Sequence, residues 1–201
     1  MTELTNGKIE NWFSIPIYHC FVNFSYQEAI SKEISSELEK LQTNDLDNPW
    51  NDGVKTSFKH NAKNNFLQKS NDFMQIIGSH CSIFCNQLDV NANYIEISES
   101  WINLSEYNDY QHFHNHVPSV YDISGVYYDK TKGDGSDGKI EFKNPNLASQ
   151  SSILLSHFSN VSFIPENGKL ILFPSFLEHC VYKNTSEQTR ISISFNVKVG
   201  L

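Results

Sequence analysis

A change in hydrophobic period near residue 92 constrains the fold of this chain more than any other sequence feature. Before it, apolar residues recur every three or four positions, which predicts helices over residues 25–42 and 64–88. After it, apolar and polar residues alternate in short runs between turns rich in Gly, Asp, Asn and Pro. The strands predicted by this pattern are residues 94–104, 111–118, 123–129, 138–143, 160–165, 169–173, 177–183 and 189–199.

Strands that are this short and this evenly spaced favour an antiparallel sandwich or barrel. One more strand is expected over residues 12–22, and residues 43–62 are expected to form a loop. No repeat or linker divides the 201 residues, so we predict a single, mainly β domain over 1–201. Within it, residues 1–91 would supply an N-terminal strand and supporting helices, and residues 92–201 would form the β core that holds the functional site.

The charge balance excludes several classes of protein. The net charge is -8, whereas a general nucleic-acid binder needs a surplus of Lys and Arg to neutralise phosphates. No apolar run is long enough to cross a membrane, and the start of the chain does not resemble a signal peptide. The four cysteines show neither a CxxC pair nor a zinc-finger spacing. We therefore expect a cytoplasmic protein without a membrane or nucleic-acid partner.

A cluster of histidines lies on one of the predicted strands. His112, His114 and His116 alternate along the strand, so their side chains would share one face. Two imidazoles placed two residues apart on a strand can bind the same metal ion at about 2.0–2.1 Å. The alternative is a surface cluster of solvated histidines. His179, which follows another predicted strand, offers a further imidazole.

The last predicted strand separates its apolar and polar residues most clearly. Its apolar side chains point one way, while Arg190, Ser192, Ser194, Asn196 and Lys198 point the other way. An arginine on the inner face of a barrel is costly unless an anion pairs with it. Arg190 therefore either binds an anion inside the barrel or lies on a face that is open to solvent.

Taken together, these motifs resemble the 2-oxoglutarate/Fe(II) dioxygenase superfamily. The resemblance covers most of residues 94–199 and is strongest to a small bacterial and phage family of 2-oxoglutarate/Fe(II) oxygenases. It implies a double-stranded β-helix, the cupin-like jelly roll. The segments that carry it are Phe113-His-Asn-His-Val-Pro-Ser119 with Ser124-Gly-Val-Tyr-Tyr128, Gly168-Lys-Leu-Ile-Leu-Phe-Pro-Ser175 with Leu177-Glu-His179, Arg190-Ile-Ser-Ile-Ser-Phe-Asn196, and more weakly Trp101-Ile-Asn103 and Lys55-Thr-Ser57.

The resemblance assigns roles to individual residues. It implies that His114, His116 and His179 hold Fe(II) and form the catalytic centre. Arg190, with Ser192, would bind the distal carboxylate of the co-substrate 2-oxoglutarate. The other implied co-substrate contacts are one of two adjacent tyrosines, Tyr127 or Tyr128, and the side chain of Asn103.

The third metal ligand departs from the family pattern. Most relatives have Asp two residues after the first metal-binding His, whereas this chain has His116. The resemblance then implies three imidazoles in place of two imidazoles and a carboxylate. His112 and Asp122 are the alternatives for the third ligand.

The function predicted on this basis is an oxygenase that uses Fe(II), 2-oxoglutarate and O₂ to hydroxylate a substrate. Two other classes of protein compete with it. A cupin-like three-histidine metalloenzyme would not use 2-oxoglutarate and would not need Arg190. A non-catalytic jelly-roll binding module would not need bound metal. The substrate, a small molecule or a protein, would be selected by residues 43–62, 105–112 and 130–138, which contain no motif that identifies it.

Overall fold

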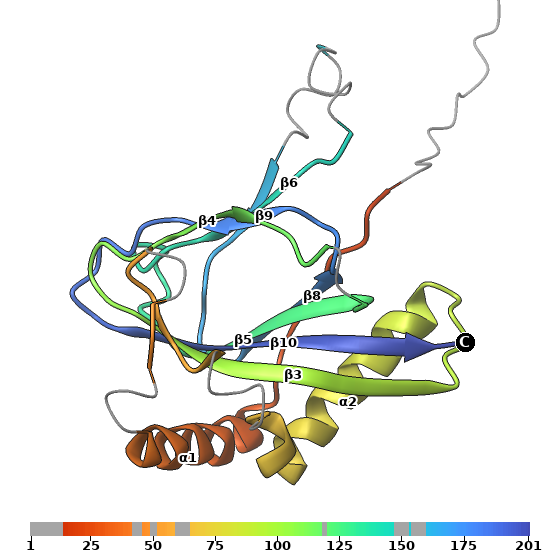
Figure 1. Ribbon diagram of the computed structural model, residues 1–201, viewed down its shortest axis with the longest axis horizontal. Helices are drawn as coiled ribbons and strands as arrows, with labels where there is room; N and C mark the ends of the chain where they lie inside the picture. The colour runs from red at the N-terminus through yellow and green to blue at the C-terminus, as the bar shows by residue number, and fades with distance from the viewer. Residues whose placement is uncertain are drawn as a thin grey trace, which may run out of the picture.

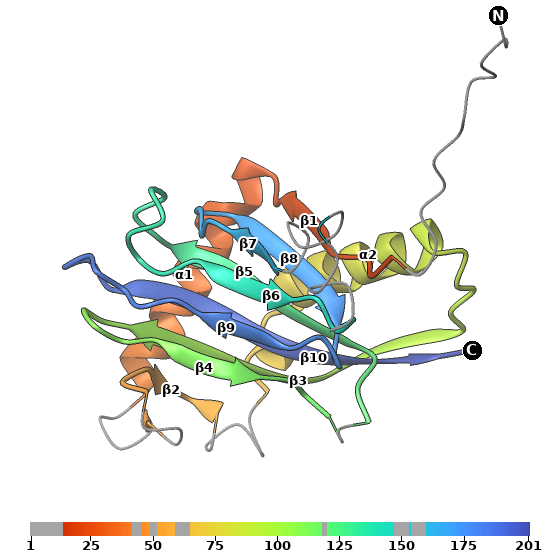
Figure 2. The ribbon, with the colours of Figure 1, turned by 90° about the horizontal axis from the view of Figure 1, so that it is seen from above.

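Two antiparallel sheets face each other in the computed structural model, which describes residues 14–41, 46–48, 52–58, 65–117, 120–146, 153 and 160–201. Figure 1 views the two sheets from the side, and Figure 2 shows the smaller sheet lying over the larger one. The larger sheet has the order β1 (Tyr18–Phe21), β8 (Lys169–Pro174), β5 (Ile123–Lys130), β10 (Arg190–Gly200), β3 (Tyr94–Ser105) and β2 (Lys55–Thr56). The smaller sheet has the order β4 (Gln111–His114), β9 (His179–Val181), β6 (Ile140–Lys143) and β7 (Asn160–Phe163).

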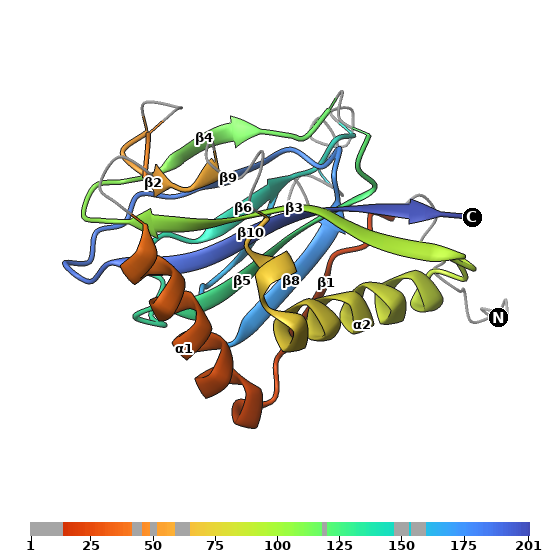
Figure 3. The ribbon, with the colours of Figure 1, turned by 60° about the horizontal axis from the view of Figure 1, so that its bottom comes forward.

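Two helices cover the outer face of the larger sheet (Figure 3). Helix α1 spans Phe24–Lys40, and the side chain of Asn23 caps it by accepting a hydrogen bond from the backbone N–H of Ser25. Helix α2 spans Asn71–Gln87 and follows a short 3₁₀ turn, η3 (Leu67–Lys69). The predicted helix over 64–88 is therefore split, because the Ser70 side chain caps a new helix at this point.

The main core lies between these helices and the larger sheet. On α2, the buried residues follow the helical period and form a stripe that faces the sheet: Phe73, Ile77, Cys81, Phe84 and Cys85. They join buried side chains from β10 and β8. A second apolar cluster fills part of the space between the two sheets and comprises Val126, Tyr128, Ile140, Phe142, Ile171, Phe173 and Leu177.

Strand β10 is central to the larger sheet, where it pairs with β3 on one side and β5 on the other. Ile193, Phe195 and Val197 belong to the helix-covered core, as the alternating pattern predicts. Arg190 and Ser192 are on the opposite face, which is turned toward the smaller sheet. This strand thus separates the packed core from the space between the sheets.

Most of the predicted strands form, although several are shorter than the pattern suggested. The predicted strand 111–118 ends at His114, because the backbone N–H of His116 instead donates to the carbonyl of Ser175. The segment predicted as a loop over 43–62 contains β2, whose two residues pair with Leu104 and Asn103 of β3. Among the described helices, none has the length and the apolar character needed to cross a membrane.

Candidate active site

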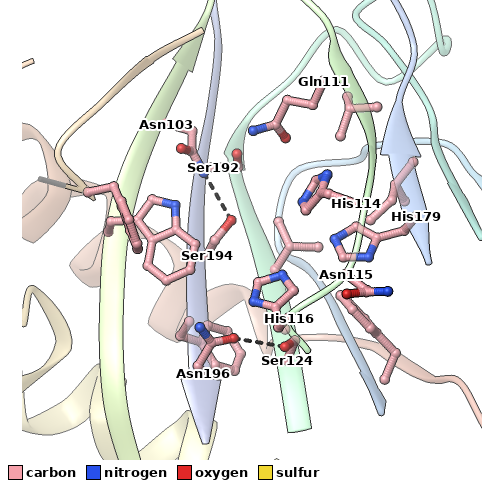
Figure 4. A pocket seen from close by; sticks show the side chains of 18 of the residues that line it. Asn103, Gln111, His114, Asn115, His116, Ser124, His179, Ser192, Ser194 and Asn196 are labelled. Atoms are coloured by element: carbon pink, nitrogen blue, oxygen red, sulfur yellow. Dashed lines mark hydrogen bonds between the residues drawn. The ribbon is translucent and has the colours of Figure 1, made fainter. Parts of the chain in front are cut away.

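A cavity of about 550 Å³ lies between the two sheets, beside the second apolar cluster. The larger sheet contributes the polar face of β10 and neighbouring residues of β3 and β5, and the smaller sheet contributes β4, β6 and β9. Figure 4 shows side chains from both sheets converging on this cavity. Along β10 the cavity extends from Asn196, which contacts His116, to Arg190 at the start of the strand, so we call its two ends the histidine end and the arginine end.

At the histidine end, His114, His116 and His179 lie together (Figure 4). One ring nitrogen from each lies within 4.8 Å of those of the other two. The ring centroids of His114 and His179 are 4.3 Å apart, since their residues pair across β4 and β9. The three rings could therefore hold one ion, as the sequence predicted for this set.

Backbone carbonyls orient two of these three rings. Nδ1 of His114 lies 2.7 Å from the carbonyl oxygen of His112, and Nδ1 of His179 lies 2.9 Å from that of Leu177. Because a carbonyl oxygen only accepts hydrogen bonds, each Nδ1 must carry the proton. Nε2 of each ring then keeps its lone pair and is available to bind a metal ion.

Burial keeps two of the rings in the neutral form that metal binding requires. His179 is 5% exposed, and burial lowers its pKa well below the usual value, with a further contribution from the neighbouring His114. Burial likewise lowers the pKa of His116 to about 4, again with a contribution from His114. At neutral pH these rings are uncharged, so each has one ring nitrogen whose lone pair can bind a metal ion.

His116 is held by contacts with the larger sheet. Its ring stacks on Trp101 at a centroid distance of 6.5 Å and forms a hydrogen bond with the side chain of Asn196. Asn196 also accepts a hydrogen bond from Ser124 and donates one to Glu99. A network of polar side chains on β3, β5 and β10 therefore fixes the ring.

The arginine end of the cavity contains one buried cation, Arg190, which is 3% exposed. Its Nη1 donates to the carbonyl oxygens of Asp137 and Gly138, each at 2.8 Å. Burial lowers the pKa of Arg190, while the hydroxyl of Tyr128 and the carboxylate of Asp137 act in the opposite direction. The guanidinium remains charged, because even a lowered arginine pKa stays far above neutrality.

Unpartnered polar atoms gather around this arginine. Within the described residues, four buried side-chain atoms have no hydrogen-bond partner: Asn103 Oδ1, Ser105 Oγ, Asp137 Oδ1 and Arg190 Nε. Arg190 pairs with Ser105 across β10 and β3, and Ser192 pairs with Asn103. Because buried polar atoms are nearly always paired, this group indicates that a polar ligand belongs here. The unpartnered N–H of a charged guanidinium suits an anionic ligand.

The structure distinguishes between the two predicted tyrosines. Tyr128 lines the cavity, and burial raises its pKa to about 12, with Arg190 acting in the opposite direction. Tyr127 is on the other face of β5, where its ring contacts Phe73 of α2 at 4.9 Å. Of the two alternatives, Tyr128 is therefore the one that faces the cavity, since successive residues of a strand point in opposite directions.

The remaining predicted residues lie at the cavity. Asn103, Ser192 and Arg190 line its arginine end, and Asn103 donates to Ser194 at 2.9 Å. Of the alternatives for the third ligand, His112 lines the cavity, and its Nε2 lies 3.3 Å from the Tyr110 hydroxyl. Asp122 accepts a hydrogen bond from the backbone of Val199 instead. Neither His112 nor Asp122 belongs to the cluster of His114, His116 and His179.

Sequence reasoning missed two groups of site residues. Asn196 contacts the His116 ring directly and Ser124 acts through Asn196, and Asn196 is on the same polar face of β10 as Arg190. That shared face was a usable signal. The carbonyls of Asp137 and Gly138 also contact Arg190, but the identity of a residue does not predict the direction of its backbone carbonyl.

Residues 99–196, which contain the three histidines and Arg190, match the model of the family described as "Putative 2OG-Fe(II) oxygenase". The matched segment makes up just under half of the chain, and over it the chain is similar to the 2OG-Fe(II) oxygenase family. The protein is thus an oxygenase of the class that uses Fe(II), 2-oxoglutarate and O₂. No curated protein sequence matches the chain.

Solved structures share the fold over most of the chain. A prolyl-4-hydroxylase from Pseudomonas putida has a TM-score of 0.65 at 12% identity, covering 92% of this chain and 93% of its own. HygX from Streptomyces hygroscopicus, with nickel and 2-oxoglutarate bound, has a TM-score of 0.61 at 13% identity, with coverages of 92% and 83%. A prolyl hydroxylase from Trichoplax adhaerens has a TM-score of 0.62 at 13% identity, with coverages of 90% and 83%. At these identities the likeness establishes the jelly-roll fold alone.

The residues present fit the cofactors of this family. Imidazole nitrogens suit iron as well as nickel and zinc, and two of the three rings present an unprotonated Nε2. The unpartnered Nε of Arg190 suits a carboxylate of the kind that 2-oxoglutarate carries. Both groups line the same cavity.

Proposed function

We propose that this oxygenase hydroxylates its substrate at a centre formed by His114, His116 and His179. Bound Fe(II) and 2-oxoglutarate would supply oxidative decarboxylation, in which O₂ gives one oxygen atom to succinate and the other to the substrate, with release of CO₂. The observation that carries the proposal is one cavity with three metal-binding nitrogens at one end and an unpartnered buried guanidinium N–H at the other.

In this proposal the histidines act as neutral donors. His114 and His179 present Nε2 because their Nδ1 protons are donated to backbone carbonyls. His116, held by Asn196 and Trp101, takes the position that is a carboxylate in most relatives. A neutral third ligand leaves more positive charge at the metal, which strengthens its attraction for an anionic co-substrate.

Arg190 orients the co-substrate through the distal carboxylate, and Ser192, Tyr128 and Asn103 add polar contacts at the same end. Their hydroxyls and amide supply hydrogen bonds that a carboxylate can accept. The apolar cluster beside the cavity, in which Phe142 and Phe173 pack against His179, limits the access of water to the site. A co-substrate held by these residues would lie between the arginine and the histidines.

The experiment is to follow O₂-dependent conversion of 2-oxoglutarate to succinate by the Fe(II)-loaded protein, with Arg190→Ala as the variant. Loss of a charged hydrogen-bonded contact worth about 1.5–3 kcal/mol should raise the KM for 2-oxoglutarate roughly 10- to 150-fold. Lys198→Ala is the matched control, because Lys198 is a cation on the same strand but outside the cavity. An equal effect of both variants would contradict the role of Arg190, and no succinate from the parent protein would contradict the function.

A three-histidine metalloenzyme without 2-oxoglutarate remains the second candidate, because His116 replaces the usual carboxylate. The same assay separates the two. A metal-loaded parent protein that neither binds nor consumes 2-oxoglutarate would favour the second candidate.

A further inference from the structure

The turn between β5 and β6 contacts Arg190 at the arginine end of the cavity. It runs through residues 131–139, and hydrogen bonds within it hold its shape. The Asp137 carboxylate accepts from the backbone N–H of Lys132 at 2.8 Å, and that of Asp134 accepts from the N–H of Ser136 at 2.9 Å. The turn is also tied to the chain before β10, where the N–H of Thr185 donates to the carbonyl of Ser136 at 2.7 Å.

This turn holds Arg190 by its backbone. Nη1 of arginine carries two protons, and two successive carbonyls, those of Asp137 and Gly138, lie 2.8 Å from it. Both Nη1 protons are therefore used, while Nε has no partner. No ion pair among the described residues involves Arg190, so neutral carbonyls rather than carboxylates fix the guanidinium. Its charge stays available for an incoming anion.

Gly138 is at the centre of this contact. Its φ is +89°, a conformation that side chains disfavour. A Cβ at this position would lie 2.3 Å from the carbonyl oxygen of Tyr182 and 3.0 Å from Nη1 of Arg190. Any side chain here would displace the turn, the arginine or both. Gly133, in the same turn, has a φ of +79° but no atom within 4 Å of an added Cβ.

We propose that residues 131–139 act as a backbone clamp on Arg190, with Gly138 as the positioning residue that sets selectivity for a 2-oxo acid with a distal carboxylate. The clamp takes both Nη1 protons and so leaves the Nε–H for the ligand. This inference rests on the proposed function, because it assumes that Arg190 binds the distal carboxylate of 2-oxoglutarate. It concerns residues outside the strands that carry the metal and co-substrate contacts.

The test measures anaerobic binding of two 2-oxo acids to the Fe(II)-loaded protein. 2-Oxoglutarate carries the distal carboxylate, and 2-oxobutyrate lacks it. Gly138→Ala should weaken 2-oxoglutarate binding at least about 10-fold, because a displaced guanidinium loses a large part of the binding free energy of its contact with the carboxylate. It should leave the weaker binding of 2-oxobutyrate within about 2-fold of the parent value, a change of less than about 0.4 kcal/mol. A loss of structure alone would not produce this difference.

Gly133→Ala is the matched control, because it adds the same methyl group at a similar φ without a collision. It should leave the affinity for both acids within about 2-fold, again under about 0.4 kcal/mol. Equal affinities of Gly138→Ala and Gly133→Ala for 2-oxoglutarate would overturn the clamp, and so would an equal loss for both acids in Gly138→Ala. A parent protein that does not bind 2-oxoglutarate would overturn the proposed function and the clamp with it.

A second variant covers the case in which Gly138→Ala does not fold. Asp137→Ala removes the hydrogen bond from Lys132 N–H together with one carboxylate near Arg190, and it keeps both carbonyls in the chain. It should weaken 2-oxoglutarate binding about 3-fold, as expected for a lost hydrogen bond that acts through the turn, and spare 2-oxobutyrate. Unchanged selectivity between the two acids in this variant would overturn the clamp.

Discussion

The two faces of the larger sheet differ in what they contact and in how fully their polar groups are paired. The face under α1 and α2 is apolar and closely packed, with Ile193, Phe195 and Val197 fully buried. The opposite face lines the cavity and carries Arg190 and Ser192. Neighbouring residues of one strand can therefore have unrelated roles, one in the core and the next in the site.

The contrast also concerns free energy. Burying apolar side chains under the helices stabilises the fold, whereas burying unpartnered polar atoms destabilises it. All four unpartnered side-chain atoms of the described residues are on Asn103, Ser105, Asp137 and Arg190, on the cavity side of the sheet or in the turn that holds Arg190. The cavity face thus carries polar groups whose burial destabilises the fold, and a bound ligand that pairs with them can offset this free-energy cost. Substitutions on the two faces should have different consequences, and the predictions below test this.

The largest expected effect is on metal binding. His179→Ala should weaken Fe(II) binding by more than about 100-fold, because it removes a ligand itself rather than a group that orients one. His179 is buried and its Nδ1 is already bonded to Leu177, so no neighbouring imidazole in the cluster can replace its Nε2. Metal affinity by competitive titration, with metal content by elemental analysis, measures the change.

His112→Ala is the control for this variant. His112 is close to the cluster, but it contacts His114 through its backbone carbonyl, which alanine keeps. Metal affinity should stay within about 3-fold, a change of less than about 0.7 kcal/mol. If His112→Ala lost as much metal affinity as His179→Ala, the assignment of His179 and not His112 as the metal ligand would be contradicted.

The next effect concerns His116, which stands where the resemblance to the family implies a carboxylate. His116→Asp should restore a carboxylate ligand next to the metal, whereas His116→Ala leaves a coordination position open. We expect the alanine variant to lose at least about 10-fold in metal affinity and the aspartate variant to lose less, since its negative charge attracts Fe(II). Iron stoichiometry and succinate release, measured side by side, decide this. Equal losses would show that His116 is not a ligand.

A matched pair of tyrosines tests the two faces directly. Tyr128→Phe should weaken 2-oxoglutarate binding roughly 2- to 12-fold, the equivalent of one lost hydrogen bond of about 0.5–1.5 kcal/mol. Tyr127→Phe should leave it unchanged, because Tyr127 packs against Phe73 on the helix side. Binding isotherms for both variants, with thermal unfolding as a check on folding, give the comparison. A stronger effect from Tyr127→Phe would reverse the assignment.

The smallest effect is a pH dependence on the helix side. His80 of α2 lies 2.8 Å from the Tyr18 hydroxyl, and burial lowers its pKa. The unfolded chain then binds a proton at His80 more readily than the folded chain does. The free energy of unfolding is therefore unaffected by this group above pH about 6.5 and falls as the pH drops below that value. Between pH 7.5 and 5.5 the Tm of His80→Gln should fall less than the Tm of the parent, with a difference between the two decreases of up to about 3 °C.

Co-substrate binding provides the control for the His80 variant. At pH 7.5 the parent and His80→Gln should bind 2-oxoglutarate equally, because His80 is on the face away from the cavity. An unchanged pH dependence of Tm would contradict the role given to His80. A changed affinity would contradict the separation of the two faces.

Strand alternation predicted much of the site. It placed Arg190 and Ser192 on one face of the last strand and left open whether that face is inside the barrel, and in the structure both residues line the cavity. The three histidines that cluster are those that the family resemblance implied. The choice between Tyr127 and Tyr128 could not be made from the sequence. It depends on the pairing of β5 with β10, where an irregularity between Ile191 and Ser192 shifts the register, and a shift of one residue exchanges the two faces.

Two other features depended on tertiary structure. The carbonyls that hold Arg190 come from a turn whose backbone direction is set by its glycines and by its contact with Thr185, and a sequence pattern does not encode that direction. Likewise, alternation placed His112 and His114 on one face, whereas the irregular pairing between Gln111 and His114 sets His112 apart from the metal-binding cluster. Local periodicity predicts faces well only where strand pairing is regular.

The measurement that tests the central claim most directly is anaerobic titration of the Fe(II)-loaded protein with 2-oxoglutarate, followed by calorimetry and visible absorption. A cavity that joins the three-histidine cluster to Arg190 predicts saturable binding of one equivalent, a new visible absorption band from coordination of the 2-oxo acid, and loss of that affinity in Arg190→Ala. Protein that holds one equivalent of Fe(II) yet shows neither heat nor an absorption change with 2-oxoglutarate would contradict it.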